Sequence, residues 1–103
     1  MAAKQAAEKF IADNAIAVFS KSYCPFCNRA KSVISGLKID QSKVGVLELD
    51  QMNDGADIQG YLKEKTGQGT VPNIFISGKH LGGCDAIVSA QSSGELDKLV
   101  ASL

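Results

Sequence analysis

The most constraining feature of the sequence is an apolar run, a helical pattern and a second apolar run, in that order. Residues 15–20 (AIAVFS) are almost entirely apolar and partly β-branched, as is typical of a strand buried on both faces. From Pro25 the apolar residues follow helical spacing as far as Gly36, and residues 44–49 (VGVLEL) indicate a second strand. This order predicts a βαβ unit with parallel strands and a right-handed crossover.

The flanking segments predict the other elements of a single domain covering residues 1–103. Helical spacing over residues 3–11 predicts an N-terminal helix, and residues 58–65 predict a short helix that stops at Gly67. Two short runs on either side of Ser77-Gly78 predict a hairpin of residues 73–76 and 79–83. A short helix near Asp85 and a closing helix over residues 96–103 follow, with SSGE at 92–95 resembling a capping box. We therefore expect a three-layer α/β fold with about four strands in a mixed sheet and helices on both faces.

Composition excludes several classes of function. Eleven basic residues balance eleven acidic ones, so nothing points to nucleic acid. The sequence has no apolar run near the roughly 20 residues of a membrane span, and the N-terminus indicates an amphipathic helix rather than a signal peptide. An odd count of three cysteines disfavours a secreted disulfide framework. We expect a reducing, cytoplasmic location, with organelle import after removal of a targeting segment left open.

Cys24 and Cys27 lie where the first strand gives way to a helix. Pro25 favours the first helical position, which predicts Cys24 at the N-cap, with the N–H groups of Phe26 and Cys27 and the helix dipole acting on its sulfur. Such surroundings, with Lys21 as an added positive charge, can lower a cysteine pKa from about 8.5 to about 3.5–7.5. Cys27, one turn further in, should be more buried and less ionised. The spacing thus predicts an outer nucleophile and an inner resolving thiol.

Two other interpretations of the pair remain open at this stage. The cysteines could be two small apolar residues at a helix start. Alternatively, Cys24, Cys27, His80 and Cys84 could form a zinc site, for which CxxC with HxxxC is acceptable spacing. Zinc knuckles, however, usually lie on small loops outside a full core, and strand alternation would direct His80 away from Cys84.

Three motifs in the same order resemble the glutaredoxins, in particular the dithiol class. They are KSYCPFC (residues 21–27), TVP (70–72) and GGCD (82–85), and the resemblance covers nearly the whole chain. It implies a thioredoxin-like fold. Two positions depart from the pattern: Phe26 stands where the family most often has tyrosine, and Ala86 stands where many members have a polar or acidic residue.

The resemblance also implies a substrate, glutathione or a protein disulfide-bonded to it, and a set of residues that bind it. Lys21 and Gln59 would meet the glycine carboxylate. Pro72 would be a cis-proline that lets Val71 present its backbone to the extended tripeptide. Cys84 and Asp85 would receive the γ-glutamyl end at a helix start. The full set implied for the groove is Lys21, Phe26, Gln59, Thr70, Val71, Pro72, Gly83, Cys84 and Asp85.

The expected activity is glutathione-dependent thiol–disulfide exchange through Cys24 and Cys27, with no metal site and no tightly bound cofactor. The expected partners are glutathione and proteins that are glutathionylated or contain disulfides, without nucleic acid or membrane, and the expected state is a monomer. The alternative is a scaffold in which two chains share a [2Fe–2S] cluster through Cys24 and glutathione. Pro25 argues against it, because proline makes the site rigid and removes an N–H near the cluster.

Overall fold

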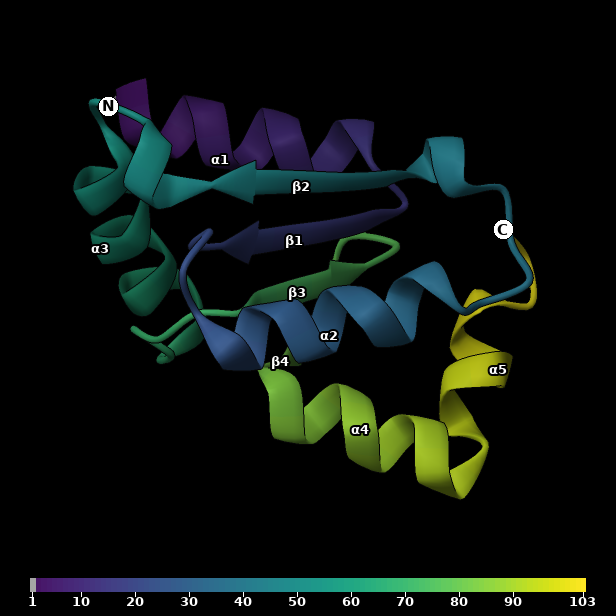
Figure 1. Cartoon of the computed structure of the whole chain (residues 1–103). Coiled ribbons are helices and arrows are strands. Elements are labelled where there is room, and N and C mark those ends of the chain that lie inside the picture. Colours follow the sequence, from purple (N-terminus) through teal and green to yellow (C-terminus); the bar gives the residue numbers. More distant parts are fainter. Residues whose placement is uncertain (1) are drawn as a thin grey trace.

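The computed structural model describes residues 2–103 and contains one four-stranded sheet with helices on both faces (Figure 1). The elements in chain order are α1 (Ala2–Asp13), β1 (Ile16–Ser20), α2 (Pro25–Ser35), η1 (Gln41–Lys43), β2 (Val44–Glu48), η2 (Leu49–Gln51), α3 (Gly55–Thr66), β3 (Asn73–Ile76), β4 (Lys79–Gly82), α4 (Cys84–Ser93) and α5 (Glu95–Val100).

The strand order is β2-β1-β3-β4, with β1 parallel to β2 and the β1–β3 and β3–β4 pairs antiparallel. The predicted βαβ unit and hairpin are therefore both confirmed. In the hairpin turn, Ser77 (φ 52°) and Gly78 (φ 80°) are both left-handed, as a two-residue turn needs to match the twist of its strands. The sheet is mixed, as expected.

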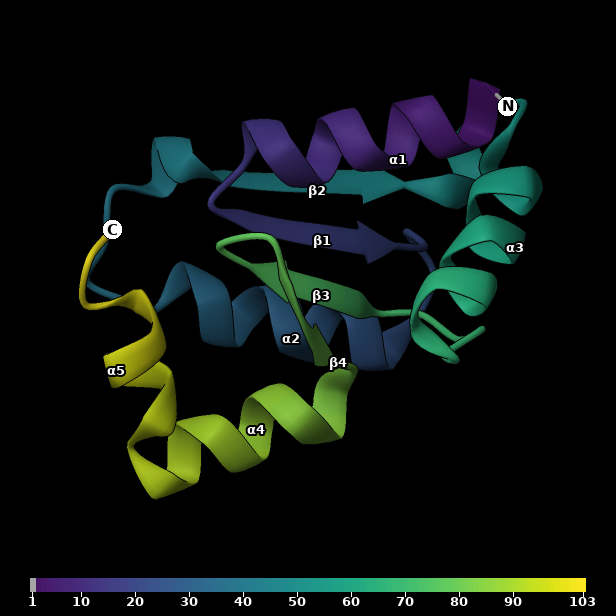
Figure 2. The ribbon, with the colours of Figure 1, turned by 180° about the vertical axis from the view of Figure 1, so that it is seen from behind.

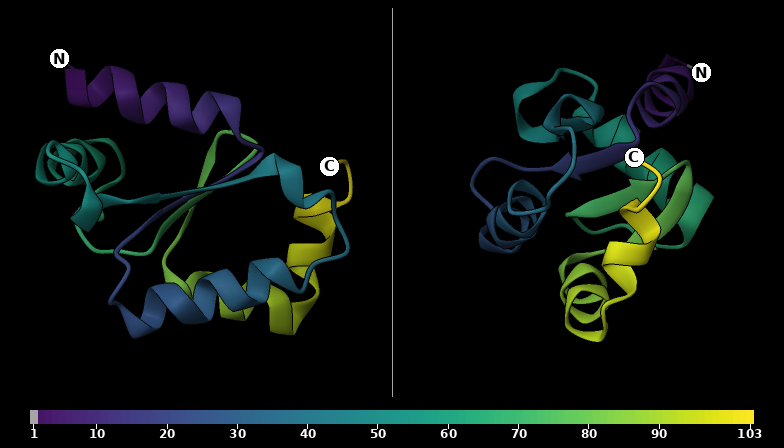
Figure 3. Two further views of the ribbon diagram at one scale, coloured as in Figure 1. Left: turned by 45° about the horizontal axis from the view of Figure 1, so that its top comes forward. Right: turned by 90° about the vertical axis from the view of Figure 1, so that its right-hand side faces the viewer.

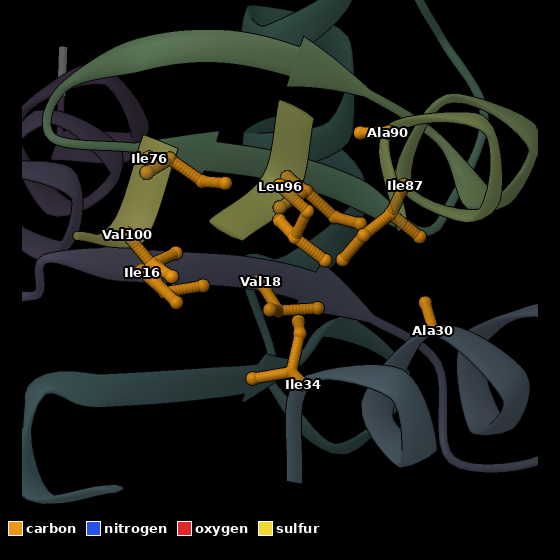
Figure 4. Close-up of a cluster of buried hydrophobic side chains, with 10 residues drawn as sticks. Ile16, Val18, Ala30, Ile34, Ile76, Ile87, Ala90, Leu96 and Val100 are labelled. Atoms are coloured by element: carbon orange, nitrogen blue, oxygen red, sulfur yellow. The ribbon is translucent and has the colours of Figure 1, made fainter. Parts of the chain in front are cut away.

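Two apolar cores lie on opposite faces of the sheet. One is formed by β1, β3, α2, α4 and α5 (Figure 4), and the other by β1, β3, α1, α3 and Leu49. Ile16 and Val18 of β1 point into the first core, while Ala17 and Phe19 point into the second. Alternate residues of a strand face opposite sides, so a strand between two cores must be apolar at every position. Figures 2 and 3 show α1 and α3 on one side of the sheet and α2, α4 and α5 on the other.

The second core is closed by contacts between α1 and α3. Phe10 packs edge-to-face on Phe19, with ring centroids 5.3 Å apart. The Tyr61 hydroxyl donates a hydrogen bond to Glu8, and Lys65 forms a 2.8 Å ion pair with the same carboxylate. These contacts explain why Tyr61 serves helix packing.

One sequence-based detail is wrong. The expected capping box at residues 92–95 does not form, because Ser92 and Ser93 belong to α4, which ends at Gly94 with φ 81°. Gly94 is also the N-cap of α5, which has no side-chain cap; the Glu95 N–H instead donates to the Ser93 hydroxyl at 3.3 Å. A left-handed Gly that ends one helix and begins the next leaves no place for a Ser N-cap.

Candidate active site

Cys24 is the N-cap of α2, as the sequence predicts. It has extended backbone angles (φ −85°, ψ 118°), and Pro25 occupies the first helical position. The Asn28 N–H donates to the Cys24 carbonyl at 3.0 Å, and the Cys24 N–H closes a turn onto the Lys21 carbonyl at 3.1 Å. The turn and the first helical bond together fix the cysteine at the end of β1.

The Cys24 thiol lies where the helix favours its ionised form. Partial burial acts to raise its pKa, but the N–H groups of Cys27 and Phe26, the Cys27 thiol and the positive charge of Lys31 together lower it below the ordinary value. The thiol forms no side-chain capping hydrogen bond, so the N–H groups act on it as oriented dipoles. The largest effect of a charged side chain comes from Lys31, one that the sequence analysis missed, rather than from Lys21.

Cys27 has the opposite character. Its side chain is fully buried, and burial raises the pKa of its thiol, as does the neighbouring Cys24, while the Lys21 N–H and the Ser20 hydroxyl oppose the rise. The two thiols act on each other in opposite directions: the Cys27 thiol lowers the pKa of Cys24, and Cys24 raises the pKa of Cys27. The two pKa shifts have the directions that the sequence predicts: the outer thiol ionises more readily than the inner one.

The turn before Cys24 is tied to η2. The Asp50 carboxylate accepts the Ser22 N–H at 2.9 Å and also the Ser22 hydroxyl. These two hydrogen bonds, with the charge of Lys21, lower the Asp50 pKa despite slight desolvation. Asp50 was not predicted as a site residue; Ser22 in the motif was the only signal, and the partner lies 28 residues away.

A groove of about 630 Å³ runs beside this turn and gathers most of the predicted glutathione-binding residues. It is lined by Phe26, Gln68, Thr70, Val71, Pro72, Gly82, Gly83, Cys84, Asp85 and Ala86. The volume is in the range of small-molecule sites. The N-terminal ends of α2 and α4 and the segment before β3 meet at this end of the sheet (Figure 1). Lys21, Cys24, Cys27 and Gln59 do not line the groove.

The segment between α3 and β3 forms one wall of the groove. The Val71–Pro72 peptide bond is cis, as predicted. Among the residues that the structure describes, none forms a hydrogen bond with the N–H or C=O of Val71. The Gln59 side chain, which does not line the groove, donates to the Gly69 carbonyl at 2.8 Å and so braces this segment.

The start of α4 forms the opposite wall. Gly83 is its N-cap, Cys84 is buried at the first helical position, and Asp85 is exposed in the first turn. The N-cap position of α4 is thus occupied by Gly83, and the Asp85 side chain does not cap the helix. The free helix N–H groups can bind a carboxylate, and the exposed Asp85 carboxylate can bind an ammonium group. Together they suit the end of a molecule that carries both groups, as an amino acid does.

The zinc alternative lacks its ligand set. His80 lies on β4 with its ring against Phe75, at 5.2 Å between centroids. Within residues 2–103, no three His, Cys, Asp or Glu side chains are grouped closely enough to hold a metal ion. No helix in this part of the chain is long and apolar enough to cross a membrane.

Comparisons with known proteins agree with this geometry. The glutaredoxin family model matches residues 16–81. Glutaredoxin-1 of Rhizophagus irregularis is 48% identical over 100 residues, covering 97% of this chain and 96% of the relative.

Two solved structures are also similar. The holo form of glutaredoxin C1 from Populus tremula x tremuloides matches with a TM-score of 0.91 and 40% identity, covering 98% of this chain and 97% of the other. A buckwheat glutaredoxin–glutathione complex matches with a TM-score of 0.91 and 41% identity, covering 97% of this chain and 88% of the other. The chain therefore belongs to the glutaredoxin family, and its Cys24–Cys27 pair places it in the dithiol class.

Proposed function

We propose that this glutathione-dependent thiol–disulfide oxidoreductase uses Cys24 as its nucleophile and Cys27 as its resolving thiol. The Cys24 thiolate attacks the glutathione sulfur of a mixed disulfide, and the thiolate of the target leaves and takes up a proton. A second glutathione thiolate then attacks the glutathione sulfur held on Cys24 and releases glutathione disulfide. On a protein disulfide, the Cys24 thiolate attacks one sulfur and releases the first target thiolate. Cys27 then attacks the sulfur of Cys24 and gives up its proton, which leaves the Cys24–Cys27 disulfide and releases the second target sulfur as a thiol.

The observation that carries this assignment is the opposite shift of the two pKa values. The thiolate is the attacking species, and Cys24 is half-exposed with a lowered pKa, while Cys27 is buried with a raised one. A nucleophile must meet its substrate, whereas a resolving thiol needs only to meet Cys24.

The groove supports recognition of glutathione by its backbone and its charges. The unpaired N–H and C=O of Val71 suit an extended peptide that pairs as an added strand. The α4 start, with Cys84 and Asp85, suits the γ-glutamyl carboxylate and ammonium. We assign Phe26, Thr70, Pro72 and Gly83 to the walls that enclose the tripeptide.

Lys21 and Gln59 are assigned to the glycine end, outside the lined groove. Lys21 precedes the nucleophile directly and is half-buried. The Gln59 amide donates to the Gly69 carbonyl and has a second N–H that can meet the glycine carboxylate.

The test of the groove is Asp85→Asn, which removes one charge at nearly constant shape. A charge-assisted hydrogen bond is worth about 1.5–3 kcal/mol, or roughly one to two decades in kcat/KM, and less at this exposed site. We expect slower reduction of a glutathione mixed disulfide with unchanged alkylation of Cys24. The control is Asp97→Asn, which removes a first-turn aspartate from α5. Equal activity of the two variants would show that the γ-glutamyl end is placed wrongly.

Protein substrates would meet an apolar rim around the nucleophile. Tyr23 and Phe26 are 69% and 62% exposed, and large exposed aromatic side chains are typical of contact surfaces. We propose that glutathionylated and disulfide-containing proteins dock here, with the chain acting as a monomer in the reducing cytoplasm. The three free thiols suit that compartment. Sedimentation at micromolar concentration, with and without glutathione, tests the monomer.

We also propose that glutathione is a co-substrate and that no cofactor is tightly bound. Pro25 is the supporting residue, since it makes the start of α2 rigid and lacks an N–H. The purified protein should be colourless, and visible absorbance with two irons per pair of chains would instead favour the cluster scaffold.

A further inference from the structure

Gln68 is a groove residue that the motif analysis did not single out. It follows Gly67, the left-handed residue that ends α3, and it is half-buried. Its side-chain amide nitrogen donates to two backbone carbonyls, Pro72 at 2.9 Å and Thr70 at 3.1 Å. The two acceptors lie on either side of Val71.

The backbone of Gln68 is itself held at both of its polar groups. Its N–H donates to the Thr66 hydroxyl at 3.0 Å, and its carbonyl accepts from the Asn73 side-chain amide at 3.5 Å. The Thr66 hydroxyl in turn donates to the Leu62 carbonyl at 2.8 Å. Thr66 ends α3 and Asn73 begins β3. The Gln68 backbone is thus hydrogen-bonded to both elements that flank the loop. Its side chain, which bonds to the Thr70 and Pro72 carbonyls, ties residues 70–72 to the same two elements.

The bond to Thr70 determines where the Val71 N–H points. In a planar trans peptide the C=O and the next N–H point in opposite directions, and the cis bond in this loop is Val71–Pro72, not Thr70–Val71. When the Thr70 carbonyl is turned toward Gln68, the Val71 N–H must point away from it. That N–H has no partner among the described residues, and Val71 lines the groove.

Gln68 also lies close to the opposite wall. A Cβ atom at Gly83 would lie 3.3 Å from the Pro72 carbonyl oxygen and 3.5 Å from the Gln68 side-chain nitrogen. The amide therefore fills the space beneath the turn that leads into α4. One side chain thus bonds to the loop that carries Val71 and lies close to the turn that leads into α4.

We propose that Gln68 is a positioning residue for glutathione: its amide turns the carbonyls around Val71 inward, so that Val71 presents a preformed hydrogen-bonding edge to the tripeptide. This inference rests on the proposed function, in which glutathione pairs with Val71. Gln68 does not touch the reacting sulfurs. Its loss should therefore weaken recognition of glutathione and leave the chemistry at Cys24 unchanged.

The experiment compares two substrates with Gln68→Leu and Gln68→Met, which keep the bulk but cannot donate. One substrate is a glutathione mixed disulfide of a chromogenic thiol, and the other joins the same thiol to 2-mercaptoethanol. We expect KM for the glutathione substrate to rise about tenfold with nearly constant kcat, the second substrate to react as before, and Cys24 alkylation to keep its pH midpoint. Gln5→Leu, at an exposed position of α1, is the control.

The outcomes separate the inference from the function on which it rests. If the wild-type protein does not prefer the glutathione substrate, the proposed function fails. If the wild type prefers it and both Gln68 variants keep that preference, the inference fails. Equal loss on both substrates would show a general structural role and would also overturn it.

A measurement on the wild-type protein stands even if the variants fold poorly. In a glutathione titration followed by NMR, the Val71 backbone amide should shift, while the Gln68 side-chain amide resonances should keep the positions they have in the free protein. Release of the Gln68 amide on binding would contradict a preformed edge.

Discussion

At the scale of single residues, the site works by making two identical side chains unequal. Cys24 and Cys27 are one helical turn apart, yet one meets the free N–H groups of α2 and the other the apolar interior. Helix geometry makes the difference, because only the N-cap position faces the positive end of the helix. Their roles can therefore be tested by the same substitution at both positions.

Cys24→Ser should abolish turnover, since no second thiol occupies a helix N-cap in the described structure. Cys27→Ser should keep most of its activity on glutathionylated substrates, because free glutathione can resolve the intermediate, and should lose activity on protein disulfides. A glutathione-coupled assay with both substrate types measures this. Similar losses in the two variants would contradict the assignment of the nucleophile.

The pH dependence of Cys24 alkylation tests its ionisation. Because the pKa of this thiol is lowered, the alkylation rate should be half-maximal below the ordinary cysteine value of about 8.5 and should fall only below that midpoint. Lys31→Gln removes a charge that favours the thiolate, so it should move the midpoint up, and by more than Lys21→Gln does. Lys38→Gln, at an exposed position beyond α2, is the control; a midpoint unmoved by Lys31→Gln would exclude that lysine as a contributor.

At the scale of elements, two glycines of α3 should respond in opposite ways to substitution by alanine. Gly55 begins the helix against η2, and a Cβ there would lie 1.9 Å from the Leu49 carbonyl oxygen, whereas a Cβ at Gly60 would meet nothing within 4 Å. Alanine gains about 0.8–1.0 kcal/mol over glycine inside a helix, but forced overpacking costs about 1–3 kcal/mol or more. Backbone cannot move aside as a side chain can, so the clash dominates at Gly55.

We therefore expect Gly60→Ala to raise the free energy of unfolding by up to about 1 kcal/mol and Gly55→Ala to lower it by about 2 kcal/mol. Urea unfolding measures both changes, provided that the dependence of the free energy of unfolding on urea concentration has the same slope in each variant. Because η2 carries Asp50, which binds Ser22 beside the nucleophile, Gly55→Ala should also slow Cys24 alkylation. A stable Gly55→Ala protein would mean that η2 can shift without cost.

Local sequence patterns predicted the helices and strands. They could not predict site residues whose role depends on contacts with distant parts of the chain. Ser20 and Pro25 bound the strand and helix on either side of Cys24, so the nucleophile could be placed from spacing alone. Asp50 and Gln68 were missed because their importance lies in which atom each side chain reaches, across 28 and up to 4 residues of sequence. Lys31 was missed because its effect is that of a charge held in space near Cys24, 7 residues away in the sequence. The capping box failed for a related reason: its letters fit, but Gly94 was already needed to end α4.

At the scale of the whole molecule, the sheet is the boundary between two cores whose buried residues have only β1 and β3 in common. All five residues of β1 are completely buried, and the strand is paired on both edges. By contrast, β2 is an edge strand with Val46 41% exposed, and α5 is six residues long. The segment that leads into Cys24 is thus the most enclosed part of the chain.

This enclosure determines how the domain opens. Amide hydrogens exchange with solvent through local fraying at weakly held elements and only through global unfolding in the most protected ones. The amides of Ile16–Ser20 should therefore exchange last, and those of α5 and the outer edge of β2 first. Thiol chemistry at Cys24 can then proceed through many cycles while α5 and β2 open and close locally. The strand that leads into the nucleophile loses its structure only when both cores unfold.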